Sequence, residues 1–186
     1  MQLKFSFSLF GRRFMFRFTV VKEPKVYTLG IASRCADGKH VIFLDYDGAK
    51  YEVVIEDIKA LQEYYRLGNF YVFVTDKKGR HWHAICLDKF WLKEAYEIVS
   101  SSSCDEAFKT APRLFEYRNW VLRTYPKGRK PKPQFVTVVE SPYEGLRQQS
   151  TAHALYLRIH YGIPIQLKNP DMLTRLPFVK YKTAKV

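Results

Sequence analysis

The sequence predicts an α+β fold with a ferredoxin-like or RNA-recognition-like core, in which the elements follow in the order β-α-β-β-α-β. Segments with alternating apolar residues indicate strands, segments with an apolar residue every three or four positions indicate helices, and the two kinds follow one another in that order. The 186 residues, 47% of them hydrophobic, suffice for one substantial core. We therefore expect a single domain over residues 1–186, with residues 1–38 as an N-terminal β-hairpin appendage and additional strands and a helix toward the C-terminus.

The N-terminal segment is rich in phenylalanine, which alternates with other residues in two stretches. Phe5 and Phe7 lie in the first stretch, Phe14 and Phe16 lie in the second, and Gly11 separates them. This pattern predicts two strands joined as a hairpin. Arginines interrupt the segment, so no apolar run approaches the roughly 20 residues of a membrane-spanning helix.

The first half of the core is expected to contain three strands and one helix. Val, Ile, Phe and Tyr predominate at residues 40–47, which predicts a strand. A helix follows from residue 51 to a stop at Gly68, and its apolar face comprises Val54, Ile58, Leu61 and Tyr65. Strands at residues 70–75 and 81–87 flank a turn.

The second half of the core repeats this alternation. Residues 90–99 predict a helix with Trp91, Ala95 and Ile98 on one face, and serines 100–103 resemble a linker. Strands are expected at residues 120–124 and 134–139, on either side of a basic loop. A last helix over residues 145–160 carries Ala152, Leu155 and Ile159 on its apolar face.

The charge of the chain indicates the class of its partner. Lys and Arg number 31 against 18 Asp and Glu, so the formal net charge is +13. Such an excess indicates a polyanionic partner, of which nucleic acid is the first candidate, and ribosomal and membrane-surface proteins share it. Because no segment could span a membrane, no membrane partner is expected. Cys35, Cys86 and Cys104 are widely spaced and odd in number. They form no disulfide framework, which suits a cytoplasmic location.

Two carboxylates end the first core strand. Asp45 and Asp47 are two positions apart, so their side chains point to the same face of the strand. Two carboxylates at such a short distance repel each other unless a cation lies between them. Mg²⁺ and Mn²⁺ prefer oxygen ligands of this kind. The alternative interpretation is a strand end that runs into an ordinary Asp-Gly turn.

Two histidines are placed by the same alternation on one face of a later strand. His81 and His83 could both ligate a metal, as in rolling-circle initiator endonucleases, where a tyrosine such as Tyr143 or Tyr156 would be the nucleophile. Alternatively, one histidine contacts a nucleotide phosphate beside the carboxylates. The third interpretation is two partly exposed histidines beside a basic turn. A zinc site that adds Cys86 and Cys104 lacks a supporting CxxC pair.

A third group of polar residues follows the second helix. Asp105 could complete a triad of metal-binding carboxylates, and Arg123 and Lys127 could hold triphosphate charge. The alternative role of Asp105 is the N-cap of a short helix over the run DEAFKT.

Prolines alternate with positive charges in the loop that follows Arg123. Lys127, Arg129, Lys130 and Lys132 would be a solvated charge run in most proteins. Their position after the candidate site favours contact with the phosphates of a DNA template or primer. Tyr64, Tyr65 and Trp82 are candidates for base stacking, although aromatic residues at helical spacing more often belong to the core.

These motifs together resemble the archaeo-eukaryotic primase superfamily, in particular the small primase-polymerase catalytic cores of plasmids and viruses. The resemblance covers Val41 to Val139. Its motifs are Phe43-Leu44-Asp45-Tyr46-Asp47, then Trp82-His83-Ala84-Ile85, then Cys104-Asp105 with Val121-Leu122-Arg123. Each motif is short, and their order on a β-α-β-β-α-β scaffold is the specific part.

The resemblance implies a template-directed nucleotidyltransferase, a DNA primase or polymerase that acts in DNA replication. By this resemblance, Asp45, Asp47 and Asp105 hold two Mg²⁺ or Mn²⁺ ions. His83 contacts the phosphate of the incoming nucleotide, although an alignment through Gly79-Arg80-His81 would assign His81 instead. The implied partners are nucleoside triphosphates, a DNA template and primer, and a replicative helicase or accessory primase domain on another chain.

Two other function classes fit parts of the sequence. A rolling-circle endonuclease would use both histidines but would leave the three aspartates unexplained. A non-catalytic nucleic-acid-binding domain would fit the basic, aromatic composition. Dependence on a divalent metal distinguishes this domain from the primase-polymerase.

Overall fold

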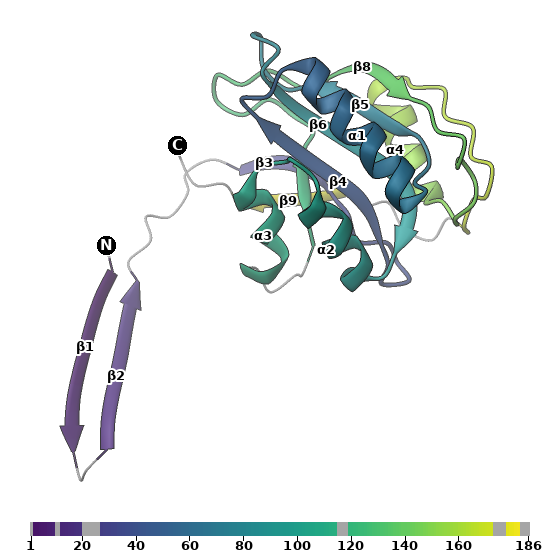
Figure 1. Ribbon diagram of the computed structural model, residues 1–186. Coiled ribbons are helices and arrows are strands. Elements are labelled where there is room, and N and C mark those ends of the chain that lie inside the picture. Colours follow the sequence, from purple (N-terminus) through teal and green to yellow (C-terminus); the bar gives the residue numbers. More distant parts are fainter. Residues whose placement is uncertain (1, 10–11, 20–26, 115–118, 173–177, 183–186) are drawn as a thin grey trace. The chain divides into compact units, whose positions relative to one another are not determined.

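The computed structural model describes residues 2–9, 12–19, 27–114, 119–172 and 178–182, and it confirms the α+β class (Figure 1). Contacts divide the chain into a small unit that contains the N-terminal hairpin and a large unit, Thr28–Tyr181. The sequence places this division near residue 38. In the structure, β3 (Tyr27–Ala32) pairs with β7 (Val121–Arg123), and almost all of β3 therefore belongs to the large unit.

The small unit contains the hairpin that the phenylalanine alternation predicts. Its strands are β1 (Gln2–Leu9) and β2 (Arg12–Thr19), which pair antiparallel with Phe5 opposite Phe16 and Phe7 opposite Phe14. The prediction of two strands separated near Gly11 is therefore confirmed.

The main sheet of the large unit has four antiparallel strands in the order β4 (His40–Asp47), β6 (His81–Phe90), β5 (Phe70–Val74), β8 (Gln134–Val139). β6 lies between β4 and β5, so β4, α1 (Tyr51–Tyr65) and β5 form a split β-α-β unit. The last strand, β8, pairs with β5 and not with β4. All four of these strands are predicted by the sequence within a few residues.

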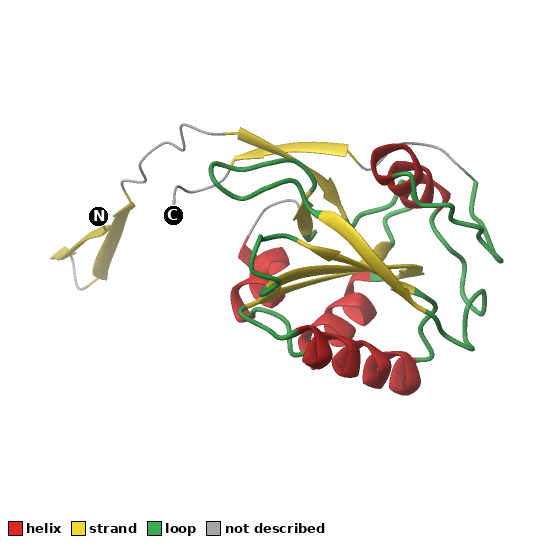
Figure 2. Ribbon diagram, turned by 90° about the horizontal axis from the view of Figure 1, so that it is seen from above, coloured by secondary structure: helices red, strands yellow, loops and turns green. Residues whose placement is uncertain are grey.

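Helices cover both faces of this sheet. Helices α1 and α2 (Leu92–Ser101) lie on one face and α4 (Thr151–Tyr161) on the other (Figures 1 and 2). Residues of β4 alternate between the two layers, since Tyr46 donates a hydrogen bond to Asp57 of α1 while the ring of Phe43 contacts His153 of α4. Burial on both faces explains the continuous apolar run of β4. None of the helices within the described ranges has the length and hydropathy to cross a bilayer.

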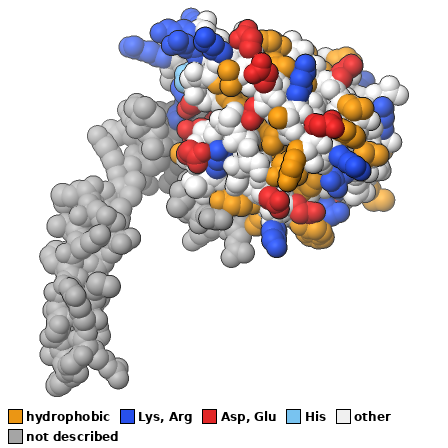
Figure 3. Space-filling view, viewed as in Figure 1, with side chains coloured by type: hydrophobic (Ala, Val, Ile, Leu, Met, Phe, Trp, Pro, Cys, Tyr) orange, Lys and Arg blue, Asp and Glu red, His pale blue; other side chains and the backbone are white. Residues whose placement is uncertain are grey.

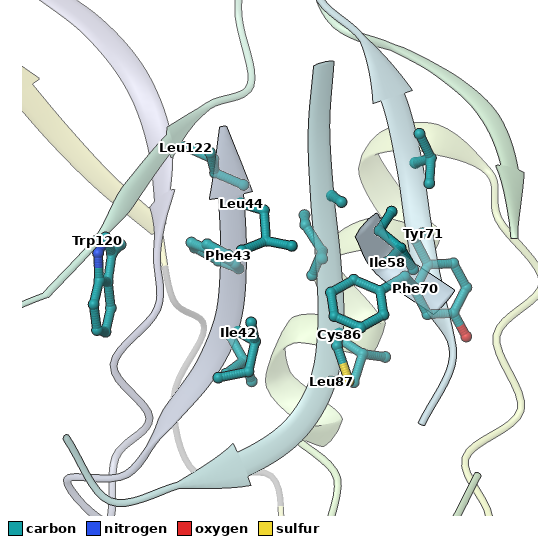
Figure 4. Close-up of a cluster of buried hydrophobic side chains, with 14 of the residues drawn as sticks. Ile42, Phe43, Leu44, Ile58, Phe70, Tyr71, Cys86, Leu87, Trp120 and Leu122 are labelled. Carbon is teal, nitrogen blue, oxygen red and sulfur yellow. The ribbon is translucent and has the colours of Figure 1, made fainter. Parts of the chain in front are cut away.

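A second sheet, in the order β7-β3-β9, lies beside β4, and β9 spans Phe178–Lys182. Trp120 fixes its junction with the main core, because its carbonyl accepts from Ser33 N at 2.9 Å and its own N–H donates to Ser33 Oγ at 3.1 Å. Figure 4 shows Trp120 and Leu122 next to the β4 side chains Phe43 and Leu44. No pattern in the sequence predicts β3 or β9.

Three helix predictions need correction. α1 ends at Tyr65 with Arg66 in the left-handed region at φ 51°, so Gly68 is not its stop. Trp91, predicted on the buried face of α2, precedes this helix and is 59% exposed.

The last helix, α4, also differs from its prediction. It begins at Thr151, not at residue 145. Its buried residues are His153, Ala154, Tyr156 and Leu157, while Ile159, predicted on the apolar face, is 71% exposed. The apolar period predicted the wrong buried face for α4, because a polar residue, His153, lies at the centre of the face that is buried.

His153 is completely buried between α4 and the strands. Its Nδ1 is 2.7 Å from Ser150 Oγ and its Nε2 is 2.8 Å from the carbonyl oxygen of Ala32. Burial lowers the pKa of His153 to about 4, so the folded protein keeps this imidazole neutral. The helix is thereby tied to β3 through an uncharged ring.

This burial predicts a pH-dependent contribution to stability. Between about pH 6.5 and pH 4 the unfolded chain binds a proton at His153 and the folded chain does not, so stability is lost as the pH falls. Relative to a His153→Gln variant, the wild type should lose about 3 kcal/mol of unfolding free energy between pH 7.5 and pH 4. Urea melts of both proteins across this range measure the difference, and parallel curves would contradict the assignment. Groups titrating in the opposite direction, such as Asp88, cancel in the comparison.

Candidate functional site

Four of the predicted site residues meet where β4 ends and β6 begins. Asp45 lies opposite His83 and Asp47 opposite His81 in the antiparallel register, and all four side chains are on the face that α4 covers. Asp45 Oδ1 is 3.5 Å from His83 Nε2, and Asp47 Oδ1 is 2.5 Å from His81 Nδ1. His83 is buried and Asp47 exposed, so the two pairs lead from the interior to the surface.

Asp105 reaches the same strand end from a distant part of the sequence. Its backbone N–H donates to the carbonyl oxygen of Asp45 at 2.8 Å. Its Oδ1 accepts from Phe108 N at 2.9 Å, which caps α3 (Glu106–Leu114). Asp105 is therefore a helix cap, as its alternative role predicts, and it also lies beside Asp45.

Burial and neighbouring charge control the protonation of the two inner groups. Burial, together with the charges of Asp47 and Asp105, raises the pKa of Asp45 to about 7. Burial, together with the charges of Arg123 and Lys130, lowers the pKa of His83 to about 3. His83 is therefore neutral at pH 7, and its contact with Asp45 is not an ion pair. A cation placed among the carboxylates would stabilise their ionised forms.

Arg123 organises the strand ends behind this group. Its guanidinium is buried and donates to three backbone carbonyl oxygens, those of Thr75 at the end of β5, Tyr125 and Pro131. These bonds fix the start and the end of the basic loop against the sheet. We therefore assign Arg123 as a positioning residue, whose charge also disfavours the protonated form of His83.

The basic loop folds back on itself in a tight turn. Lys127 and Lys130 exchange two backbone hydrogen bonds of 3.0 and 2.9 Å, and Gly128 between them has the positive φ of 57° that this turn needs. Arg129 and Lys130 are exposed, and the charge of Lys130 acts on both Asp45 and His83. Burial, aided by the charges of Lys130 and Arg123, lowers the pKa of Lys127. In Figure 3 a group of Lys and Arg side chains gathers at this end of the molecule, next to acidic and histidine side chains.

Lys132, the fourth predicted DNA-binding residue, has a different environment. Its Nζ donates to the carbonyl oxygen of His160 at 2.9 Å and lies 4.9 Å from the ring centroid of Tyr161. It therefore stabilises the C-terminus of α4, where a cation is favoured.

Asp57 is a supporting residue that the sequence analysis missed. Its carboxylate accepts from the Tyr46 hydroxyl at 2.8 Å and from Ser103 N at 3.0 Å. It thus holds the segment before Asp105 against the α1 side of β4. Its position on a polar helix face carried no signal in the sequence, because the contacts come from β4 and from the α2–α3 connection.

Several other predicted residues lie elsewhere. Cys86 is on the opposite face of β6 from His83, and the Sγ of Cys104 donates to Val99 O, so the zinc set does not assemble. Trp82 is buried and donates to the carbonyl oxygen of Ala49. Tyr64 and Tyr65 lie on α1, on the other face of the sheet from the histidines.

The two candidate tyrosine nucleophiles are also engaged away from the histidine pair. The hydroxyl of Tyr143 donates to Glu63 on α1, and the buried hydroxyl of Tyr156 donates to Thr124. No group of three or more His, Cys, Asp or Glu side chains among the described residues is arranged to hold a metal ion.

Comparisons of the chain with protein-family models, with curated proteins and with solved structures found no match.

Proposed function

We propose that this protein is a template-directed nucleotidyltransferase with DNA primase or polymerase character, similar to the primase-polymerase cores named above. The observation that carries the proposal is that four separate segments meet where β4 ends and β6 begins. They bring together two carboxylates on β4, a buried neutral histidine on β6, the helix cap Asp105 and a cationic turn. The β4-α1-β5-β6-α2 order matches the first part of a ferredoxin-like core, whereas the last strand, β8, lies beside β5 and not beside β4 as that fold would require. Such a combination of residues suits phosphoryl transfer, because that reaction depends on positioning and on charge neutralisation.

The residues suit divalent ions. Asp45, Asp47 and Asp105 offer only oxygen ligands. The pKa of Asp45, raised to about 7, leaves this carboxyl only partly ionised at neutral pH without a nearby cation. Mg²⁺ keeps several waters and needs only one or two carboxylates together with substrate phosphates, so a pre-assembled group of three protein ligands is unnecessary. The three aspartates would hold the ions. When bound, such ions neutralise charge on the attacking and leaving oxygens.

The chain's own residues would bind and orient the nucleotide. His83, neutral and opposite Asp45, can donate a hydrogen bond to a phosphate oxygen. Because it carries no charge, it would not repel a metal ion at the neighbouring carboxylates. Lys127 and Lys130 supply positive charge for the triphosphate, and Arg123 holds their turn in place. Arg129 extends the cationic surface toward the DNA backbone.

Extension of a primed DNA template tests the proposal. The purified chain is incubated with labelled primer-template and with ribo- or deoxyribonucleotides in Mg²⁺ or Mn²⁺. We expect metal-dependent, template-directed incorporation and no stable protein–DNA adduct after denaturation. Absence of incorporation under every condition, with metal-independent DNA binding, would favour the non-catalytic binding domain. An adduct lost on Tyr143→Phe or Tyr156→Phe would favour the endonuclease.

Metal binding should stabilise the fold. A ligand that binds only the native state at 100 times its Kd adds about 2.7 kcal/mol, which raises the Tm of a chain this size by roughly 5–10 °C. Thermal melts with and without Mn²⁺ measure the shift, which should disappear in the Asp45→Asn, Asp47→Asn double variant. A Glu52→Gln, Glu56→Gln variant removes two exposed carboxylates from α1 and should keep the shift. Equal shifts in both variants would place the ions elsewhere.

The two histidines should differ in their effects on catalysis. His83 is buried beside Asp45, whereas His81 lies farther out and contacts Asp47. His83→Ala should raise the KM for the nucleotide by about tenfold, the value of one charge-assisted hydrogen bond, and His81→Ala should raise it less. Steady-state extension at varied nucleotide concentration measures both. The reverse ranking would assign the nucleotide contact to His81.

A further inference from the structure

A row of aromatic rings leads from the basic turn to the edge strand of the main sheet. The row comprises Tyr125, His160, Tyr161, Phe73 and Phe135, whose successive ring centroids are 4.8, 4.8, 4.7 and 5.7 Å apart. These rings come from the loop after β7, from the end of α4, and from the neighbouring strands β5 and β8. Residues distant in the sequence thus form one continuous chain of ring contacts, of which part is buried.

Both ends of the row are exposed to solvent, while Phe73 in its interior is buried. Tyr125 and Phe135 are each 38% exposed, and Phe73 between the other rings is 1% exposed. Val136, beside Phe135, is 43% exposed. The row therefore has a rigid base and two accessible rings, which suits a ligand with flat apolar groups at intervals.

Positive charge lies along the same row. Lys132 lies over the ring of Tyr161, and the Lys127–Lys130 turn begins two residues after Tyr125. Arg123 donates to the carbonyl oxygen of Tyr125, so the first ring of the row is fixed to the candidate site itself. Accessible rings next to cations favour a polyanion that carries planar bases.

We infer that the aromatic-basic strip, defined as Tyr125, the 127–130 turn, His160, Tyr161 and Phe135, binds single-stranded DNA. Bases stack on Tyr125 and Phe135, and phosphates contact Arg129 and Lys130. The strand is single because the stacking of base pairs in a duplex would cover the faces that the rings need. The identification of this strand as the DNA template rests on the proposed function, and the strip leads it to Asp45 and His83.

Fluorescence anisotropy of a labelled 12-nucleotide oligo-dT in EDTA tests the strip without any catalysis. Tyr125→Leu and Phe135→Leu should each weaken binding by about tenfold with an unchanged salt dependence, because stacking is lost and no phosphate contact is. Lys130→Gln should instead reduce the salt slope by about one. Thermal melts of each variant establish that the fold is retained.

Tyr64→Leu is the matched control. Tyr64 is 80% exposed, but it lies on α1 on the opposite face of the sheet, so its removal should leave oligo-dT binding unchanged. Duplex DNA should bind more weakly and should not respond to Tyr125→Leu. Equal effects of Tyr64→Leu and Tyr125→Leu, or no effect of either strip variant, would overturn the inference. Tighter Tyr125-dependent binding of oligo-rU would assign the strip to RNA and overturn the DNA assignment.

These outcomes are separable from those of the proposed function. Tyr125-dependent binding by a chain that incorporates no nucleotide would support the strip and contradict the nucleotidyltransferase. Normal primer extension by a Tyr125→Leu, Phe135→Leu variant that binds oligo-dT like the wild type would do the reverse.

Discussion

Replacing Asp45 by Asn is expected to reduce template-directed nucleotide incorporation by at least about 10²- to 10³-fold, the usual loss when one preorganised electrostatic group is removed from an active site. Asp45 is half-buried at the strand end, opposite His83, and its backbone carbonyl oxygen accepts a hydrogen bond from the N–H of Asp105. An amide of the same shape keeps this packing but cannot neutralise a divalent ion. The variant should therefore lose nucleotide incorporation but keep DNA binding, and its oligo-dT affinity should stay within about twofold of the wild type.

The same substitution should not destabilise the protein. Burial and the charges of Asp47 and Asp105 already disfavour the ionised form of Asp45, as its pKa of about 7 indicates. Neutral Asn removes that repulsion, so the Tm without metal should be unchanged or higher. Single-turnover extension and thermal melts on one preparation measure both effects, with Glu56→Gln on α1 as the control. Near-normal incorporation by Asp45→Asn would remove this carboxylate from the proposed mechanism.

Replacing Phe43 by Ala is expected to destabilise the fold by about 3–5 kcal/mol, the range for loss of a fully buried phenylalanine. Phe43 is 0% exposed in the middle of β4, and its ring meets His153 of α4 at 5.9 Å between centroids. Its removal leaves a cavity between the sheet and α4. Figure 4 shows Phe43 among the other buried side chains of β4, β5 and β6.

Urea unfolding at pH 7.5 measures this loss. Leu146→Ala is the control, because this leucine is 63% exposed and its truncation should change the unfolding free energy by less than about 0.5 kcal/mol. Phe43→Leu should lose less than Phe43→Ala, since most of the volume is retained. Equal losses for Phe43→Ala and Leu146→Ala would show that α4 does not depend on this contact for its packing.

The sequence alone determined the strands and helices that have a strong period. The residue content of 40–47 and the turn before residues 81–87 placed β4 and β6 correctly. The strand period of two also placed Asp45 with Asp47, and His81 with His83, each pair on one strand face. This succeeded because the strand period of two is a local property of the backbone. The N-cap alternative for Asp105 was also readable from its own neighbours.

Only the tertiary structure decided which faces meet and which polar groups are already engaged. The buried face of α4 follows from His153. One of its partners, Ser150, is the N-cap of the helix, and the other, Ala32, lies far away in the sequence, in β3. The sequence suggested that Arg123 and Lys132 are free to bind phosphate, but both donate to backbone carbonyl oxygens. The aromatic row likewise joins rings from four regions of the chain, namely β5, the loop after β7, β8 and the end of α4. Such contacts depend on sequence-distant backbone positions, which no local pattern of residues encodes.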